Sequence, residues 1–200
     1  MLRDGHCPPM RLMLVVLLAL IIRNAPPASG RTYDPVADPE AVVLVDQARF
    51  TVLTPQLIRM EWSSDARFED HASLVFINRR LPVPPFNAYS DGDWFTLDTE
   101  KLIVKYKKNS GKFAGHNLSV ELLLNGKKIT WSPGTEDEGN LQGTMRTLDG
   151  VRGGASLEQG LLSRNGWVLI DDSDRPLFDN SQWPWAMPRP EGDRQDWYFL

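Results

Sequence analysis

Two acidic clusters contain residues that could do chemistry. Glu136, Asp137 and Glu138 are consecutive, and three neighbouring carboxylates could hold a calcium ion. Their spacing is not that of a calcium loop, which favours a solvated acidic loop. Asp171 and Asp172 follow an apolar run, and paired carboxylates can serve as acid and base in glycoside hydrolysis. Adjacent strand residues point to opposite faces, however, and this favours a turn role for the pair.

Other catalytic and ligand-binding patterns are weak. His71 and His116 lie far apart, and neither has a metal-ligand partner at the usual spacing. The sequence has neither a Gly-x-Ser-x-Gly elbow nor a phosphate loop. We therefore expect no metal and no cofactor.

Aromatic side chains and one sequon give weaker indications. Trp131 and Trp185 stand in or beside expected loops, where flat rings could stack on sugars. Asn117, followed by Leu118 and Ser119, forms an N-glycosylation sequon.

The elements that position these residues are expected to be strands. Residues 57–62 alternate, so that Ile58, Met60 and Trp62 face a core while Arg59 and Glu61 face water. Similar short runs recur about every ten residues, which is typical of an antiparallel β-sandwich. The expected strands are residues 41–45, 49–53, 57–62, 73–77, 94–97, 102–107, 118–124, 127–131, 167–170 and 196–200.

Two further features support this all-β prediction. Asn125 and Gly126 separate two apolar runs, which is a strong hairpin signal because both residues tolerate positive φ. Trp62 and Trp167 lie on expected strands and should belong to the core.

Composition excludes several classes of protein. The chain has 200 residues, of which 42% are hydrophobic and 24% charged, so it is neither disordered nor a polytopic membrane protein. A formal net charge of −4 does not indicate nucleic-acid binding. A single cysteine excludes an internal disulfide framework.

The first thirty residues have the pattern of a signal peptide. Arg11 precedes an apolar run, residues 12–22, which is too short for a membrane span. Small residues at Ala28 and Gly30 suggest cleavage near Gly30; the competing interpretation is a buried helix. We expect a signal peptide over residues 1–30, a lead-in strap over 31–40 and a sandwich over 41–200. The chain is then secreted, periplasmic or lumenal.

One stretch is more specific than these motifs. Residues 140–150 (NLQGTMRTLDG) and 157–173 (LEQGLLSRNGWVLIDDS) resemble the amino-terminal domain of glycoside hydrolase family 31, which includes α-glucosidases and α-xylosidases. The order of features over residues 41–200 is also similar, and residues 196–200 (DWYFL) resemble the strand that leads into the catalytic barrel. The terminal apolar run looks cut in mid-element.

This resemblance implies a fold and a role. The family's domain is a galactose-mutarotase-like β-sandwich beside a (β/α)8 barrel, and both catalytic aspartates, a nucleophile and a general acid, lie on that barrel. Such enzymes retain anomeric configuration through a covalent glycosyl-enzyme intermediate. A loop of the sandwich reaches the sugar, and by position Arg146 and Asp149 are the candidates. The alternative for both is to brace a turn at Asp149 and Gly150.

We therefore expect a non-catalytic sandwich whose partners are the barrel and an α-glucoside or α-xyloside at its entrance. No nucleic acid and no stable membrane span are expected. Two rivals stay open: a free-standing secreted carbohydrate-binding module, and an interaction domain that binds no sugar.

Overall fold

Alternating apolar residues build strands through most of this chain. The computed structural model describes residues 33–143, 154, 157–181 and 184–200. These residues form twelve strands and one 3-10 helix, η1 (Pro39–Ala41), and every pairing between the named strands is antiparallel. The prediction of an all-β antiparallel fold is confirmed.

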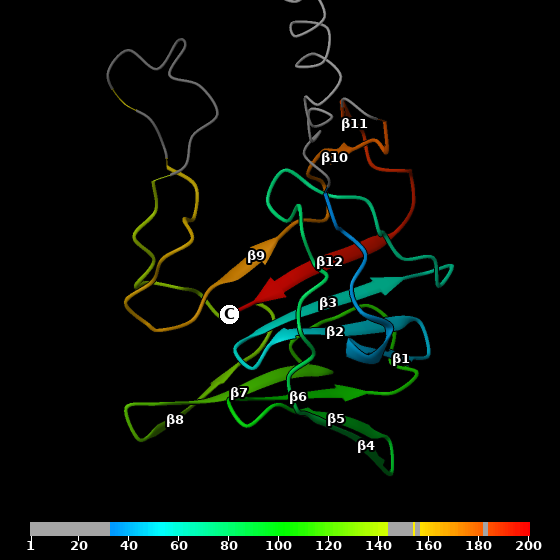
Figure 1. Cartoon of the computed structure of the whole chain (residues 1–200). Helices are drawn as coiled ribbons and strands as arrows, with labels where there is room; N and C mark the ends of the chain where they lie inside the picture. Colours follow the sequence, from blue (N-terminus) through cyan, green and yellow to red (C-terminus); the bar gives the residue numbers. More distant parts are fainter. Residues whose placement is uncertain (1–32, 144–153, 155–156, 182–183) are drawn as a thin grey trace, which may run out of the picture. The chain divides into compact units, whose positions relative to one another are not determined.

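Ten of the strands belong to two five-stranded sheets (Figure 1). The first sheet has the order β1 (Val42–Val45), β2 (Ala48–Thr54), β3 (Leu57–Ser63), β12 (Arg194–Phe199) and β9 (Leu169–Asp171). The second has the order β4 (Asn87–Asp91), β5 (Trp94–Asp98), β6 (Leu102–Lys107), β7 (Leu118–Leu124) and β8 (Lys127–Trp131). A small ribbon pairs β10 (Leu177–Phe178) with β11 (Ala186–Met187).

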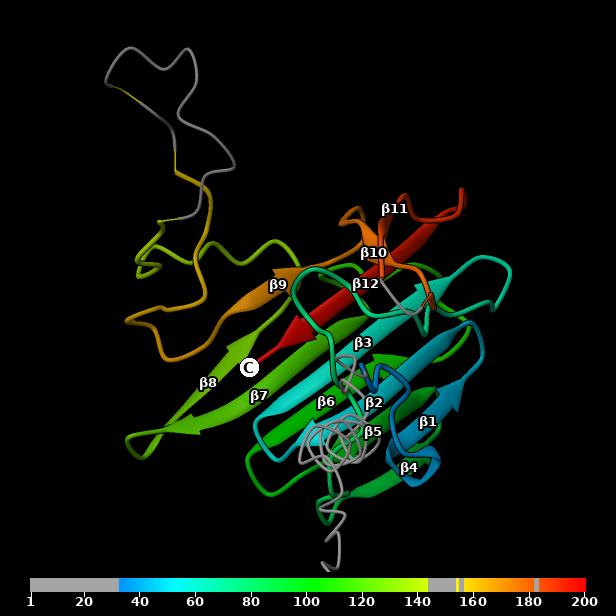
Figure 2. The ribbon, with the colours of Figure 1, turned by 45° about the horizontal axis from the view of Figure 1, so that its top comes forward.

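The two sheets share one hydrophobic core, which is the arrangement of a β-sandwich (Figures 1 and 2). Phe50 and Met60 enter it from the first sheet, and Phe95, Val104 and Val120 from the second. Phe50 and Phe95 meet with ring centroids 5.2 Å apart. Trp62 and Trp167 are also buried in this core, as predicted.

The hairpin between β7 and β8 turns at the expected residues. Asn125 has φ 51° and Gly126 has φ 76°, so both central residues are left-handed, as a type I′ turn requires. The strands on either side have the predicted bounds, residues 118–124 and 127–131.

The short strands β10 and β11 were not among the expected strands, and two longer segments also differ from the sequence expectation. Residues 73–77 do not form a strand; Ser73 makes a single bridge to Leu177. The segment instead covers the first sheet, where Phe76 stacks on Tyr198 with ring centroids 3.5 Å apart. Strand β4 was not expected, because its sequence (NAYSD) is rich in turn residues and fully exposed.

The lead-in strap is fastened to the domain at Asp34. Its backbone carbonyl accepts a hydrogen bond of 2.7 Å from Arg79 N, and its N–H donates to Asn78 Oδ1 at 2.8 Å. The predicted signal peptide, residues 1–30, lies outside the described residues. In the part that the structure describes, no helix is long and apolar enough to cross a membrane.

Candidate functional site

The outer face of the first sheet carries a buried network of ion pairs. Strand alternation puts Arg59, Glu61 and Asp196 on the side away from the sandwich core, with Asp196 directly opposite Glu61. We expected this face to be wet, and that expectation is wrong. Arg59 and Glu61 are each 2% exposed and Asp196 is 3% exposed, because the segment around residues 69–79, together with Asp172 and Arg189, covers them.

Arg59 holds this network together. Its Nε donates to Asp196 Oδ1 and its Nη2 to Asp196 Oδ2, both at 2.8 Å. The same Nη2 lies 3.1 Å from Glu61 Oε1. Arg49 donates two hydrogen bonds to Glu61, from Nε to Oε2 at 2.6 Å and from Nη2 to Oε1 at 2.9 Å. Arg189 Nη2 lies 3.0 Å from carboxylate oxygens of both Asp196 and Asp172, so every carboxylate of the network faces a guanidinium.

Burial and charge shift the carboxyl pKa values in different directions. Burial acts to raise the pKa of Asp196, but Arg59 and Arg189 outweigh it and hold that pKa below its usual value. Burial raises the pKa of Glu61, although Arg59 and Arg49 oppose it. Burial also raises the pKa of Asp172. Shifted pKa values mark both active sites and structural ion pairs. Here each carboxylate is paired with an arginine guanidinium, which favours a structural role for the network over a catalytic one.

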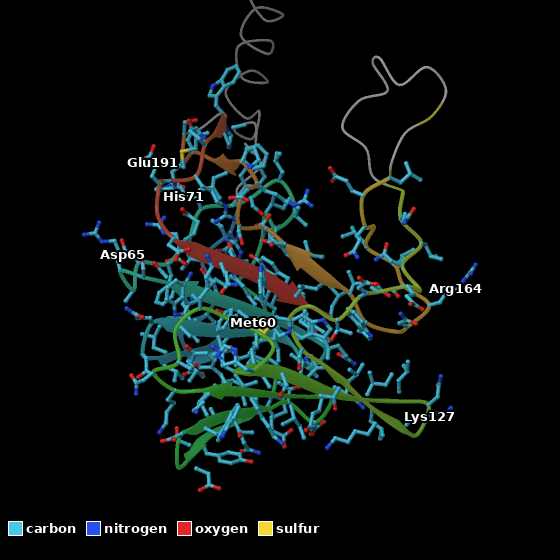
Figure 3. The ribbon with its side chains drawn as sticks, turned by 180° about the vertical axis from the view of Figure 1, so that it is seen from behind. Met60, Asp65, His71, Lys127, Arg164 and Glu191 are labelled. Carbon is cyan, nitrogen blue, oxygen red and sulfur yellow. The ribbon has the colours of Figure 1, made fainter. Side chains whose placement is uncertain are left out.

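A cleft of about 420 Å³ lies over this network. Glu61 and Asp196 are among its lining residues, together with Phe68, Pro188 and Arg194. The Nε of Arg194 is buried and has no hydrogen-bond partner among the described residues. Asp65 and Glu191 lie at the same end of the molecule as this cleft, far from Arg164 (Figure 3). The cleft has room for a small polar molecule, but its buried carboxylates are already engaged.

The two residues chosen for sugar contact by resemblance, Arg146 and Asp149, lie outside the described residues. The base of the segment that carries them is well defined. Asp137, 9% exposed, accepts hydrogen bonds from Ser163 Oγ at 2.6 Å and Asn165 Nδ2 at 2.8 Å. The interpretation of residues 136–138 as a solvated loop is therefore wrong for Asp137, which instead ties the segment's two legs together.

The two tryptophans chosen for stacking have opposite environments. Trp131 is 2% exposed, and its ring meets Phe199 with centroids 5.1 Å apart. It is a core residue, so the expectation that it stands ready to stack on a sugar is corrected. Trp185 is 73% exposed beside strand β11. The alternation in β8 was the missed signal, because it turns Trp131 inward with Ile129.

The predicted glycosylation residue, Asn117, is fully buried at 0% exposure. Its Nδ2, the atom that would carry a glycan, donates to Lys112 O at 2.9 Å, while its Oδ1 accepts from Ala114 N at 2.8 Å. This side chain closes the loop before β7. The expectation of a glycan on Asn117 is therefore corrected, since a folded chain offers no room for one.

Asp171, Asp172 and His71 have structural partners, whereas His116 is exposed. Asp171 accepts from Ser173 N at 3.0 Å, as the predicted turn role requires, but Asp172 turns into the buried network. His71 Nδ1 lies 2.6 Å from Glu69 Oε1. Over the described ranges, no group of three or more histidine, cysteine or acidic residues is placed to hold a metal ion.

Sequence reasoning overlooked two exposed aromatic residues on the second sheet. Tyr89 is 54% exposed and Trp94 is 40% exposed, and both point away from the core. Alternation through residues 94–97 contained the signal, because Phe95 and Leu97 point inward and Trp94 therefore points outward.

Comparison with models of known protein families gives no match for this chain, and comparison with curated protein sequences gives none either. The functional assignment therefore rests on the residues and their geometry.

Proposed function

We propose that this chain is a non-catalytic, galactose-mutarotase-like β-sandwich of a family 31 α-glycosidase. In this role the sandwich packs beside a (β/α)8 barrel and shapes the entrance for an α-glucoside or α-xyloside. The motifs around residues 140–150 and 157–173 suggest the family, and the all-β architecture with two five-stranded sheets supports it. Hydrolysis with retention belongs to two aspartates of the barrel.

The observation that carries this proposal is the segment between β8 and β9, residues 132–168, which we call the arm. Its described legs run outward from the ends of the two strands (Figure 2). Four leucines on these legs are about half exposed or more, namely Leu141, Leu157, Leu161 and Leu162 at 50%, 47%, 57% and 68%. Leu141 N donates a hydrogen bond of 2.9 Å to Leu162 O, so at least these two exposed leucines are neighbours. Adjoining exposed apolar side chains mark surfaces that another molecule or domain covers.

The arm is held in a defined place at its base. Asp137 joins its two legs through Ser163 and Asn165, and Asn140 Oδ1 accepts from Gly160 N at 2.8 Å. A domain that shapes a substrate entrance needs a loop anchored in this way, because an unanchored loop would contribute no fixed wall.

Engagement of the buried carboxylates supports the non-catalytic part of the proposal. A retaining glycosidase needs two carboxyl groups about 5 Å apart on either side of an open sugar site. Glu61 and Asp196 lie on neighbouring strands, but both are bound by Arg59 and nearly inaccessible. We accordingly give neither of them a catalytic role.

We further propose that residues 1–30 direct the chain into the secretory pathway. The apolar run over residues 12–22 and the small residues before Arg31 are the basis. Amino-terminal sequencing of the exported protein tests this, and a start near Arg31 is the expected result. Retention of the apolar run in the exported protein would overturn it.

Sequencing the transcript through the codon for Leu200 tests the family assignment. The expected result is an open reading frame that continues into a barrel domain with two aspartates at the family's nucleophile and general-acid positions. A stop codon directly after Leu200 contradicts the assignment. The purified chain should give no turnover of aryl α-glucosides or α-xylosides, and measurable turnover would also overturn the proposal.

A free-standing carbohydrate-binding module is the second candidate, and the exposure of Trp185 favours it. Calorimetric titration with maltose and xylo-oligosaccharides discriminates the two. Binding that is lost in Trp185→Ala, together with a stop codon after Leu200, would support the module.

A further inference from the structure

The outer face of the second sheet has a flat aromatic surface that none of the roles above uses. Trp94 on β5 lies directly opposite Asp91 on β4 and directly opposite Lys107 on β6. Directly opposite residues share a face of the sheet, with Cβ atoms about 5 Å apart. One indole ring is therefore flanked by a carboxylate acceptor on one side and an ammonium donor on the other.

Tyr89 adds a second ring to this surface. It lies two residues before Asp91 on β4 and is therefore the diagonal neighbour of Trp94. Thr96, which lies opposite Tyr89 and two residues after Trp94, shares this outer face but is only 7% exposed. We call Tyr89, Asp91, Trp94 and Lys107 the aromatic platform.

A shallow hollow continues the same face toward β7 and β8. It has a volume of about 380 Å³, and its lining includes Ile103, Glu121, Leu123 and Lys128. Strands lie about 4.8 Å apart, so the face extends about 14 Å from β4 to β7. That is long enough for a chain of several sugar rings, and too long and open for a single small molecule.

Charge on this face identifies the kind of ligand. Three carboxylates and three ammonium groups alternate across it, namely Asp91, Asp98 and Glu121 with Lys105, Lys107 and Lys128. Glu121 lies 3.2 Å from Lys105 Nζ and 2.6 Å from Lys128 Nζ. Half of these groups would repel a polyanion and half a polycation, so the face matches a neutral ligand that both donates and accepts hydrogen bonds.

We propose that the aromatic platform binds a neutral polysaccharide. Pyranose rings present an apolar C–H face to Trp94 and Tyr89, while their hydroxyl groups donate to Asp91 and accept from Lys107. This site is separate from the arm, and it does not depend on the family assignment. Its success or failure is therefore distinguishable from that of the proposed glycosidase role.

Affinity electrophoresis of the full chain tests this site. Native gels contain soluble starch or neutral xylan in separate arms, and polygalacturonate as the anionic comparison. We expect one or both neutral polysaccharides to retard the chain. Trp94→Ala should weaken the interaction about tenfold, Tyr89→Ala by a smaller factor, and Trp94→Phe should keep most of it. Polygalacturonate should retard the chain little.

Leu44→Ala is the matched control, because Leu44 is also exposed and apolar, at 65%, but lies on β1 of the other sheet. It should leave retardation unchanged, and urea unfolding should show that all variants remain folded. The proposal is overturned if no neutral polysaccharide retards the chain, if only the polyanion does, or if Trp185→Ala abolishes retardation while Trp94→Ala does not. Self-association that requires Trp94, without any sugar effect, would assign the face to a second copy of the chain and also overturn it.

Discussion

Arg59 on β3 and Asp196 on β12 form a buried two-point ion pair between residues 137 positions apart in the sequence. Each of its two contacts is 2.8 Å, and both side chains are almost inaccessible to water. The pair joins the early hairpin of the first sheet to the last strand. A buried pair is weak evidence for net stability, but the loss of one partner leaves a buried charge unmatched and is costly.

Asp196→Asn should lower the free energy of unfolding by about 3 kcal/mol at pH 7, because Arg59 and Arg189 lose a buried counter-charge. The folded-state pKa of Asp196 lies below its unfolded value, so this contribution is present above the unfolded pKa of about 3.9 and is lost as the pH falls through the folded pKa. Urea titrations at pH 7 and pH 3 should therefore show the difference from wild type shrinking in acid.

Asp172→Asn is the matched control for that experiment. Burial raises the folded-state pKa of Asp172, so its contribution is present below the unfolded pKa and is lost as the pH rises through the folded pKa. At pH 7 the loss of unfolding free energy in Asp172→Asn should be smaller than the loss in Asp196→Asn. In acid the loss in Asp172→Asn should grow. Equal, pH-independent losses in both variants would refute this account of the network.

Asn117→Ala should destabilise the chain by about 1–3 kcal/mol, because Ala114 N and Lys112 O lose their partner in a buried loop. Ser119→Ala removes the sequon but leaves these bonds in place. In protein secreted from eukaryotic cells, the peptide that contains Asn117 should have no glycan mass in either form, so that wild type and Ser119→Ala differ only by the oxygen atom of the Ser119 hydroxyl. A glycan on Asn117 of the folded wild type would contradict the structure.

Asp137→Ala should loosen the arm without unfolding the sandwich. The two lost hydrogen bonds should lower the local stability of the arm by about 1–2 kcal/mol, which raises the fraction of molecules with an open arm about 5- to 30-fold. Limited trypsin digestion should therefore cleave between residues 139 and 165 faster by about the same factor. Glu136→Ala changes an exposed neighbour and should cleave at the wild-type rate. Unchanged cleavage in Asp137→Ala would show that the arm is held elsewhere.

Trp131→Ala should cost about 3–5 kcal/mol of unfolding free energy, because it empties a core site against Trp167 and Phe199. Trp185→Ala should change stability by less than about 0.5 kcal/mol, since its ring is exposed. Denaturant unfolding of the two variants checks both values. Similar stabilities would mean that Trp131 is not part of the core.

The period-two pattern predicted most of the fold because one face of each sheet packs on the shared hydrophobic core. Residues 102–107, 118–124 and 127–131 are strands with the expected bounds. Strand β4 escaped prediction because both of its faces are exposed and only its pairing with β5 defines it. Residues 73–77 have strand-forming side chains but no neighbouring strand to pair with, and so they pack on Tyr198 instead.

The candidate sites were harder to predict because they depend on residues far apart in the sequence. Alternation correctly put Arg59 and Glu61 on one face. Nothing local indicates that Asp196 lies beside them on that face, or that the segment carrying Phe76 packs over the sheet. Asn117 shows the same limit: its sequon is a local pattern, while its burial depends on the loop that it closes. Alternation along the strand is enough to predict that Trp94 points outward. Its two charged neighbours, Asp91 and Lys107, follow only from the register between strands.

Immunocapture of the natural protein tests the central claim most directly. An antibody raised against the purified chain would be used to isolate the protein from its source. The mass of the captured protein and its turnover of aryl α-glucosides and α-xylosides would then be measured. The sandwich role predicts a captured protein much larger than the 22.6 kDa chain, with α-glycosidase activity that the purified chain lacks. A captured protein no larger than the chain and without that activity would contradict it.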